Sequence, residues 1–179
     1  MLKSRFLKSI LILSLIVPMV ATAQTISIIP KPVQLKVETG FFTMDENTSI
    51  HFNPAQKKLA PAVAYFVHVI EQISGYTLKQ NITTKYRIQM LLDTAIVPQE
   101  EGYQLEINQK GVKIIANSYG GVFYAMQSIL QMLPPTRNNA KLVLPYMHIT
   151  DYPRFKWRGM HLDVSRHFFG PDVIKQYID

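Results

Sequence analysis

The sequence predicts an α+β domain over residues 24–150, with a mostly antiparallel sheet and two helices on one face, followed by a βα unit. Two helices are expected because residues 56–74 and 119–133 repeat apolar side chains at helical spacing. The shorter segments around them alternate apolar and polar side chains, which is typical of half-buried strands. Beyond this domain, an apolar-rich strand over residues 157–164 leads through a polar loop to a helix that Pro171 opens. A strand, a loop and a helix in this order begin a βα barrel or a doubly wound sheet.

The first 23 residues are typical of a secretory signal peptide. Lys3, Arg5 and Lys8 precede an apolar run over residues 10–20, and a small-residue motif predicts cleavage after Ala23. The run is short for a membrane span, so we expect a secreted or periplasmic protein with no stable membrane span after cleavage. A retained anchor is the alternative.

The charge of the remaining chain is mild. The 19 Lys and Arg residues fall to 16 without the three in the signal segment, against 12 Asp and Glu, so the net charge falls from +7 to +4. No basic run longer than Lys57-Lys58 remains, and nucleic acid is therefore not an expected partner. The chain has no cysteine, which excludes disulfides and thiolate metal sites.

The N-terminal part of the domain begins with residues 24–37, which alternate around Pro30 and Pro32. Because proline cannot donate within a central ladder, this pattern predicts an extended lead-in and a short edge strand. Gly40 marks a turn, and a further strand is expected over residues 41–52.

The helix over residues 56–74 is apolar on more than one side, which indicates burial under the sheet, and Gly75 is placed to end it. A strand follows over residues 85–92. Residues 102–107 and 112–116 then form a hairpin whose turn ends in a glycine.

The last quarter of the chain has a high density of ionisable residues, and it carries a long motif. In single letters the motif is P-R-F-x-x-R-G-x-x-L-D-x-x-R-H-F, which stands here as Pro153-Arg154-Phe155, Arg158-Gly159, Leu162-Asp163 and Arg166-His167-Phe168. This stretch closely resembles the opening of the catalytic barrel in family-20 glycoside hydrolases, the β-N-acetylhexosaminidases. Residues 117–131 resemble the second helix of the accessory domain that precedes that barrel, and residues 29–32 are also typical of it.

The resemblance implies an accessory domain over residues 24–150 and the start of a (β/α)8 catalytic TIM barrel over residues 151–179. It implies a hydrolase that removes terminal N-acetylglucosamine or N-acetylgalactosamine from the non-reducing ends of glycans. The reaction would retain configuration and use the substrate's own 2-acetamido group as nucleophile. No metal or organic cofactor is implied.

The resemblance also implies that the catalytic acid/base glutamate and its aspartate partner follow a later barrel strand, beyond residue 179. This chain would then hold no catalytic residue and be inactive alone. Glu100-Glu101 is an adjacent acidic pair in the accessory domain, and we interpret it as solvated loop charge rather than a substitute.

Arg158 is the candidate substrate-binding residue, because in the family the arginine at this position binds the hydroxyls at C3 and C4 of the terminal sugar. A planar fork of donors can contact two vicinal hydroxyl oxygens, and the alternative is a structural arginine that joins the barrel to the accessory domain. Asp163, Arg166 and His167 are expected to hold the site in place rather than touch substrate, with Asp163 pairing with Arg166 or Arg158. Trp157 is expected to pack at the domain interface.

We expect the chain to be the front part of a longer enzyme, because a barrel needs roughly 250 residues. Two alternatives remain. One is another glycan hydrolase with the same accessory domain, and the other is a secreted, non-catalytic carbohydrate- or protein-binding module.

Overall fold

The computed structural model describes residues 26–135 and 141–178, so the predicted signal peptide over residues 1–23 lies outside the described residues. The strands and helices are β1 (Gln34–Met44), β2 (Thr48–His51), the short 3-10 helix η1 (Lys57–Leu59), α2 (Ala60–Ser74), β3 (Lys79–Gln80), β4 (Tyr86–Leu92), β5 (Tyr103–Asn108), β6 (Gly111–Ala116), α3 (Tyr119–Gln131), β7 (Leu142–Asp151) and α4 (Pro171–Ile178). Within this part of the chain, no helix has the length and apolar character that a membrane crossing requires.

Seven strands form one sheet in the order β1-β7-β5-β6-β4-β2-β3. The pairs β1–β7, β7–β5 and β5–β6 are antiparallel, and the pairs β6–β4, β4–β2 and β2–β3 are parallel. The sheet is therefore mixed rather than mostly antiparallel. α2 connects β2 to β3, and β3 and β4 both pair with β2 in the parallel sense, as strands joined through a crossover helix do.

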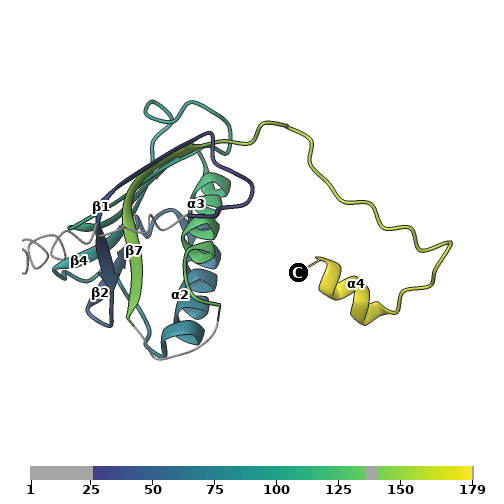
Figure 1. Cartoon of the computed structure of the whole chain (residues 1–179), viewed down its shortest axis with the longest axis horizontal. Coiled ribbons are helices and arrows are strands. Elements are labelled where there is room, and N and C mark those ends of the chain that lie inside the picture. The colour runs from purple at the N-terminus through teal and green to yellow at the C-terminus, as the bar shows by residue number, and fades with distance from the viewer. Residues whose placement is uncertain (1–25, 136–140, 179) are drawn as a thin grey trace, which may run out of the picture.

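Both crossover helices cover the same face of the sheet, as predicted (Figure 1). The core lies between this layer and the sheet. Its fully buried side chains include Val63, Phe66 and Ile70 of α2, Val122, Met126 and Ile129 of α3, and Ile88, Met90, Leu105, Ile107 and Ile114 of the strands.

Both predicted helices are confirmed, with small shifts at their ends. The 3-10 helix η1 precedes α2, and Gly75 ends α2 in the left-handed conformation (φ +86°), with its N–H donating to the carbonyl of Glu71 at 2.8 Å. Ser118 caps α3, where its Oγ accepts from the N–H of Gly121 at 3.4 Å.

The strand predicted over residues 41–52 is divided in two. β1 ends at Met44 and β2 begins at Thr48. Between them Asp45 accepts the N–H of Asn47 at 2.9 Å and donates its own N–H to Oγ1 of Thr48 at 3.1 Å. These side-chain bonds satisfy a turn that the apolar and polar alternation did not reveal.

β7 was not predicted from the sequence, although it lies between β1 and β5 in the sheet. Pro145 within it argues against a central strand, because proline has no N–H to donate. The structure accommodates Pro145 beside a register shift in β1 between Val37 and Phe41. Gly40 lies in that shift with φ +120°, and a Cβ there would collide with the ring of Tyr146.

The strand predicted over residues 157–164 is not formed, whereas α4 forms as predicted after Gly170. A strand needs a neighbour for its N–H and C=O groups, and the described residues offer this segment none. Figure 1 shows the chain leaving the sheet after β7 and running extended to α4, which lies apart from the sheet. None of the described residues of α4 is buried.

Candidate functional site

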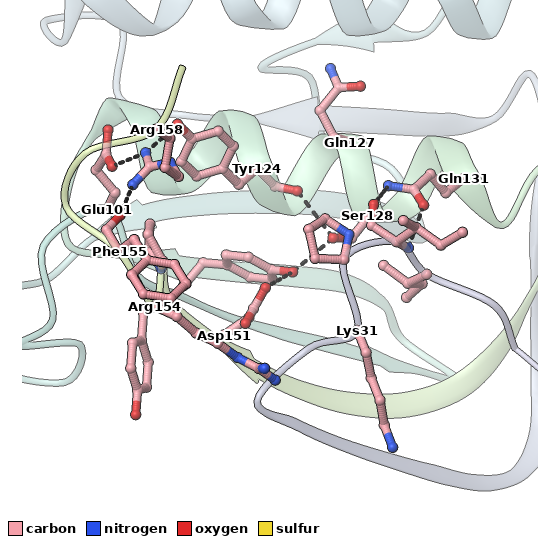
Figure 2. Close-up of a pocket in the computed structure, with 16 residues that line it drawn as sticks. Lys31, Glu101, Tyr124, Gln127, Ser128, Gln131, Asp151, Arg154, Phe155 and Arg158 are labelled. Atoms are coloured by element: carbon pink, nitrogen blue, oxygen red, sulfur yellow. Dashed lines mark hydrogen bonds and ion pairs between the residues drawn. The ribbon is translucent and has the colours of Figure 1, made fainter. Parts of the chain in front are cut away.

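A cleft of about 670 Å³ lies where the chain leaves the sheet (Figure 2). Its lining comes from residues 28–31, one face of α3, residues 151–155 and Arg158, together with Glu101 and Tyr103 at and just before the start of β5. The cleft therefore gathers the N-terminal segment, the second helix and the beginning of the family-20-like motif.

The floor of the cleft is a polar network on Tyr103, Ser128 and Asp151. The hydroxyl of Tyr103 lies 2.7 Å from Oγ of Ser128 and 3.4 Å from Oδ2 of Asp151. Ser128 donates to the carbonyl of Tyr124 at 3.1 Å, which leaves its oxygen free to accept from Tyr103. Tyr103 is 1% exposed, and this burial raises its pKa, with the charge of Asp151 acting in the same direction and the hydrogen bond to Ser128 acting against it.

Two further side chains hold the N-terminal segment along the cleft through three hydrogen bonds. The side-chain amide of Gln131 accepts the N–H of Ile29 at 2.8 Å and donates to the carbonyl of Ile29 at 3.0 Å. Oδ1 of Asp151 accepts the N–H of Val33 at 3.1 Å. Asp151 therefore connects the start of β1 to the point at which the chain leaves the sheet.

Arg158 lies at one rim of the cleft and makes three hydrogen bonds, two of them to the domain. Its Nη2 donates to Oε2 of Glu101 at 2.5 Å and to the hydroxyl of Tyr124 at 3.1 Å, and its Nη1 donates to the carbonyl of Phe155 at 2.7 Å. The guanidinium carbon also lies 5.9 Å from the centre of the Tyr124 ring. The hydrogen bond to Glu101, and then the one to Tyr124, hold the pKa of Arg158 above its ordinary value.

The interpretation of Glu100-Glu101 as solvated charge is wrong for Glu101. Its side chain is 37% exposed and pairs with Arg158, whose side chain is 41% exposed. Glu100 does behave as a solvated charge, since it lies 3.7 Å from Lys156 and both side chains are more than three-quarters exposed. The two neighbouring glutamates therefore differ in what they contact.

The three residues expected to support Arg158 lie elsewhere in the segment. Oδ1 of Asp163 accepts N–H groups from Ser165 at 2.9 Å and Arg166 at 3.3 Å, and Oδ2 lies 3.4 Å from Nε of Arg166. The bonds from Ser165 and then Arg166 lower the pKa of Asp163. Of the two partners considered, the structure pairs Asp163 with Arg166 and not with Arg158. His167 is exposed.

Trp157 does not pack at an interface in this structure, because its side chain is 92% exposed. The residues that contact Arg158 were missed because nothing near Arg158 in the sequence points to them. Glu101 is 57 positions away from it and Tyr124 is 34. In the described part of the chain, no three His, Cys, Asp or Glu side chains gather in a way that could hold a metal ion.

The sequence matches two family models in succession. Residues 25–152 match glycosyl hydrolase family 20, domain 2, and residues 155–179 match glycosyl hydrolase family 20, catalytic domain. The chain belongs to glycosyl hydrolase family 20. The first match ends, and the second begins, within the segment between Asp151 and Arg158 that lines the cleft.

Curated family-20 relatives include a β-hexosaminidase of Porphyromonas gingivalis, which is 35% identical over 162 residues. That alignment covers 86% of this chain and 21% of the relative. A β-hexosaminidase of Vibrio furnissii is 30% identical over 165 residues, covering 88% of this chain and 24% of the relative. The chain thus spans about a fifth to a quarter of the length of these relatives.

Solved structures agree with this assignment. The N-acetyl-β-hexosaminidase of Streptomyces plicatus superposes with a TM-score of 0.72 at 28% identity, covering 84% of this chain and 31% of that one. The family-20 exo-β-N-acetylglucosaminidase of Vibrio harveyi, in complex with N-acetylglucosamine, gives a TM-score of 0.70 at 28% identity. It covers 84% of this chain and 23% of that one.

Proposed function

We propose that the protein carrying this chain is a β-N-acetylhexosaminidase that removes terminal N-acetylglucosamine or N-acetylgalactosamine from non-reducing ends of glycans. The observation that carries the proposal is the order of the two matches, domain 2 followed directly by the start of the family-20 catalytic domain. The names of the curated relatives support the reaction, and the N-acetylglucosamine bound to the Vibrio harveyi enzyme supports the class of sugar.

The proposed chemistry is substrate-assisted cleavage with retention of configuration. The carbonyl oxygen of the 2-acetamido group attacks the anomeric carbon while a carboxylic acid protonates the leaving oxygen, and water then opens the cyclic intermediate. Two displacements at the same carbon give net retention. The glutamic acid that donates the proton, and the aspartate that orients the acetamido nitrogen, are expected outside residues 1–179.

Arg158 is the residue of this chain that we assign to the sugar. Its side chain is 41% exposed at the rim of the cleft, so a ligand can reach it. A guanidinium has five N–H donors, and the three hydrogen bonds of Arg158 leave the Nε–H and one Nη1–H, which lie on different sides of the group and can each donate to one sugar oxygen. The loop before α4 contains Asp163, Arg166 and His167. The contacts between Asp163 and Arg166 order this loop.

We also infer that the protein is exported, to the periplasm or beyond. The support is the basic, apolar and small-residue pattern of residues 1–23, which has the form of a secretory signal peptide. Export fits a substrate class of glycan ends. Mass spectrometry of the mature protein tests this inference, and we expect it to begin at Gln24.

The reaction is tested with nitrophenyl glycosides and the full-length protein. We expect release of nitrophenol from the N-acetyl-β-glucosaminide or N-acetyl-β-galactosaminide, and none from the β-glucoside, which lacks the acetamido nucleophile. The 179-residue chain alone is expected to release none. Equal hydrolysis of the β-glucoside would contradict the substrate-assisted route. A full-length protein that binds N-acetylglucosamine but cleaves no N-acetylhexosaminide would be a binding module instead.

A further inference from the structure

We propose that Glu101, a residue of domain 2, is a positioning residue that holds the guanidinium of Arg158 ready for the sugar. The inference rests on the proposed function, because it needs Arg158 to bind the substrate. It adds that the accessory domain takes part in forming the site, through one carboxylate and the Tyr124 ring (Figure 2).

The contacts of Arg158 fix one amino group of its guanidinium, Nη2, and leave two of the other N–H donors free. Both hydrogens of Nη2 are used, one on Glu101 and one on the hydroxyl of Tyr124. One hydrogen of Nη1 is used on the carbonyl of Phe155. Nη2 therefore faces domain 2, and the Nε–H and one Nη1–H stay available for other acceptors.

Glu101 is presented from a loop that is itself tied to the domain. Its φ is +57°, an uncommon conformation for a residue with a side chain. The adjacent Gly102 donates to the carbonyl of Gln99 at 3.0 Å and accepts from the N–H of Asn117 at 3.1 Å. A Cβ on Gly121 would collide with the carbonyl of Gly102, so the first turn of α3 packs directly against this loop.

Tyr124 supplies the second contact from the first half of α3. Its ring lies beside the guanidinium and its hydroxyl accepts a hydrogen bond at 3.1 Å. The ring also packs edge-on against Phe123 at 6.2 Å, and Phe123 lies 6.0 Å from Tyr65 of α2. The aromatic surface that Arg158 contacts is thus part of the helix layer of domain 2.

The pair is better suited to set geometry than to stabilise the fold. Both side chains are more than a third exposed, so solvent screens much of their attraction. An arginine that is already ordered loses less rotamer freedom when it binds a ligand, which improves affinity without a new contact. If Arg158 contacts the same hydroxyls in the substrate and the transition state, releasing it should raise KM and leave kcat nearly unchanged.

The first test uses the full-length protein and its kinetics on the nitrophenyl N-acetylhexosaminide. We expect Glu101→Ala to lower kcat/KM by about tenfold or more, mainly through KM, because a hydrogen bond to a charged group is lost. Glu101→Gln keeps an acceptor and should recover part of the loss. Glu100→Gln is the matched control, since Glu100 lies in the same loop and contacts only the exposed Lys156, and it should match the wild type.

The outcomes separate this inference from the proposed function. A wild-type protein that cleaves no N-acetylhexosaminide defeats the proposed function, and this inference with it. An active wild type in which Glu101→Ala behaves like Glu100→Gln defeats this inference alone.

A double mutant distinguishes positioning from a general structural effect. If Glu101 acts through Arg158, then Glu101→Ala should cause no further loss of kcat/KM in an Arg158→Ala background. Full additivity of the two losses would overturn the proposal, because it would show that Glu101 acts independently of Arg158.

Trp157 provides a spectroscopic test in the 179-residue chain itself. It is the single tryptophan of the sequence and adjoins Arg158, so its fluorescence anisotropy reports the mobility of this segment. Glu101→Ala should lower the anisotropy at unchanged circular dichroism, whereas Glu100→Ala should not. Equal anisotropy in the wild type and Glu101→Ala would show that Glu101 does not hold the segment.

Discussion

Gly111 follows the two-residue turn of the β5–β6 hairpin, where Asn108 and Gly111 pair directly. Its φ is +128°, and a Cβ there would collide with the carbonyl oxygen of Arg87 in β4. The need for glycine at this position was predicted from the sequence, because the hairpin pattern requires a positive φ. The close approach of Gly111 to Arg87 was not predicted, since it depends on the parallel pairing of β6 with β4.

Gly111→Ala is expected to lower the free energy of unfolding by about 2 kcal/mol or more, from backbone strain and the collision together. The control is Gly170→Ala, because no atom lies within 4 Å of a Cβ at Gly170. Urea unfolding of the chain measures both variants. A Gly111→Ala midpoint equal to that of the control would contradict the hairpin geometry.

Tyr103, which is buried, and Tyr76, which is partly buried, predict a loss of stability at alkaline pH. Burial raises the pKa of Tyr76 from 10.0 to about 12, and burial also raises the pKa of Tyr103. A folded-state pKa above the unfolded value favours the protonated form, so this stabilisation is complete below pH 10 and is lost toward about pH 12. The free energy of unfolding should therefore fall above pH 10, and less steeply in Tyr76→Phe. Identical slopes for the two proteins would contradict the assignment.

At the scale of elements, the sequence predicted what is local. The helices follow from apolar spacing within one segment, and the β5–β6 hairpin follows from two adjacent strands and their turn. β7 was not predicted because Pro145 is tolerated only through the register shift in β1, more than 100 positions earlier. The strand expected over residues 157–164 is absent because a strand is fixed by its partners, and local composition does not supply them.

In the site, too, local features were predicted and contacts between distant residues were not. The motif that contains Arg158 could be recognised in the sequence, and it indicated which residue to examine. The contacts of Glu101 and Tyr124 with Arg158 could not be predicted from the sequence, because no local pattern links the β4–β5 loop or α3 to residue 158. Only the packing of that loop against α3 brings the carboxylate and the ring to the guanidinium.

α4 should be the least protected helix of the chain. Its described residues include no buried side chain, and an eight-residue helix without packing is marginal in water. Hydrogen exchange should therefore be fast in α4 and slow in α3, which buries Val122, Met126 and Ile129. Equal protection of the two helices in the 179-residue chain would show that α4 is packed against the domain.

At the scale of the whole molecule, contacts with domain 2 hold the segment that follows β7 in place. Asp151 contacts Val33 and Tyr103 at the end of β7, and Arg158 contacts Glu101 and Tyr124 a few residues later. The two family-20 matches meet between these points. Domain 2 therefore contacts the chain on both sides of the junction, and the proposed activity places a substrate-binding residue on the far side.

The measurement that tests this account most directly is kcat/KM of the full-length protein on nitrophenyl N-acetyl-β-glucosaminide, with Arg158 intact and with Arg158→Lys. Lysine keeps the charge but not the planar set of donors. We predict hydrolysis by the wild type and a loss of about tenfold to a hundredfold in the variant. Equal rates would remove Arg158 from the sugar site, and an inactive wild type would contradict the assignment of the protein as a β-N-acetylhexosaminidase.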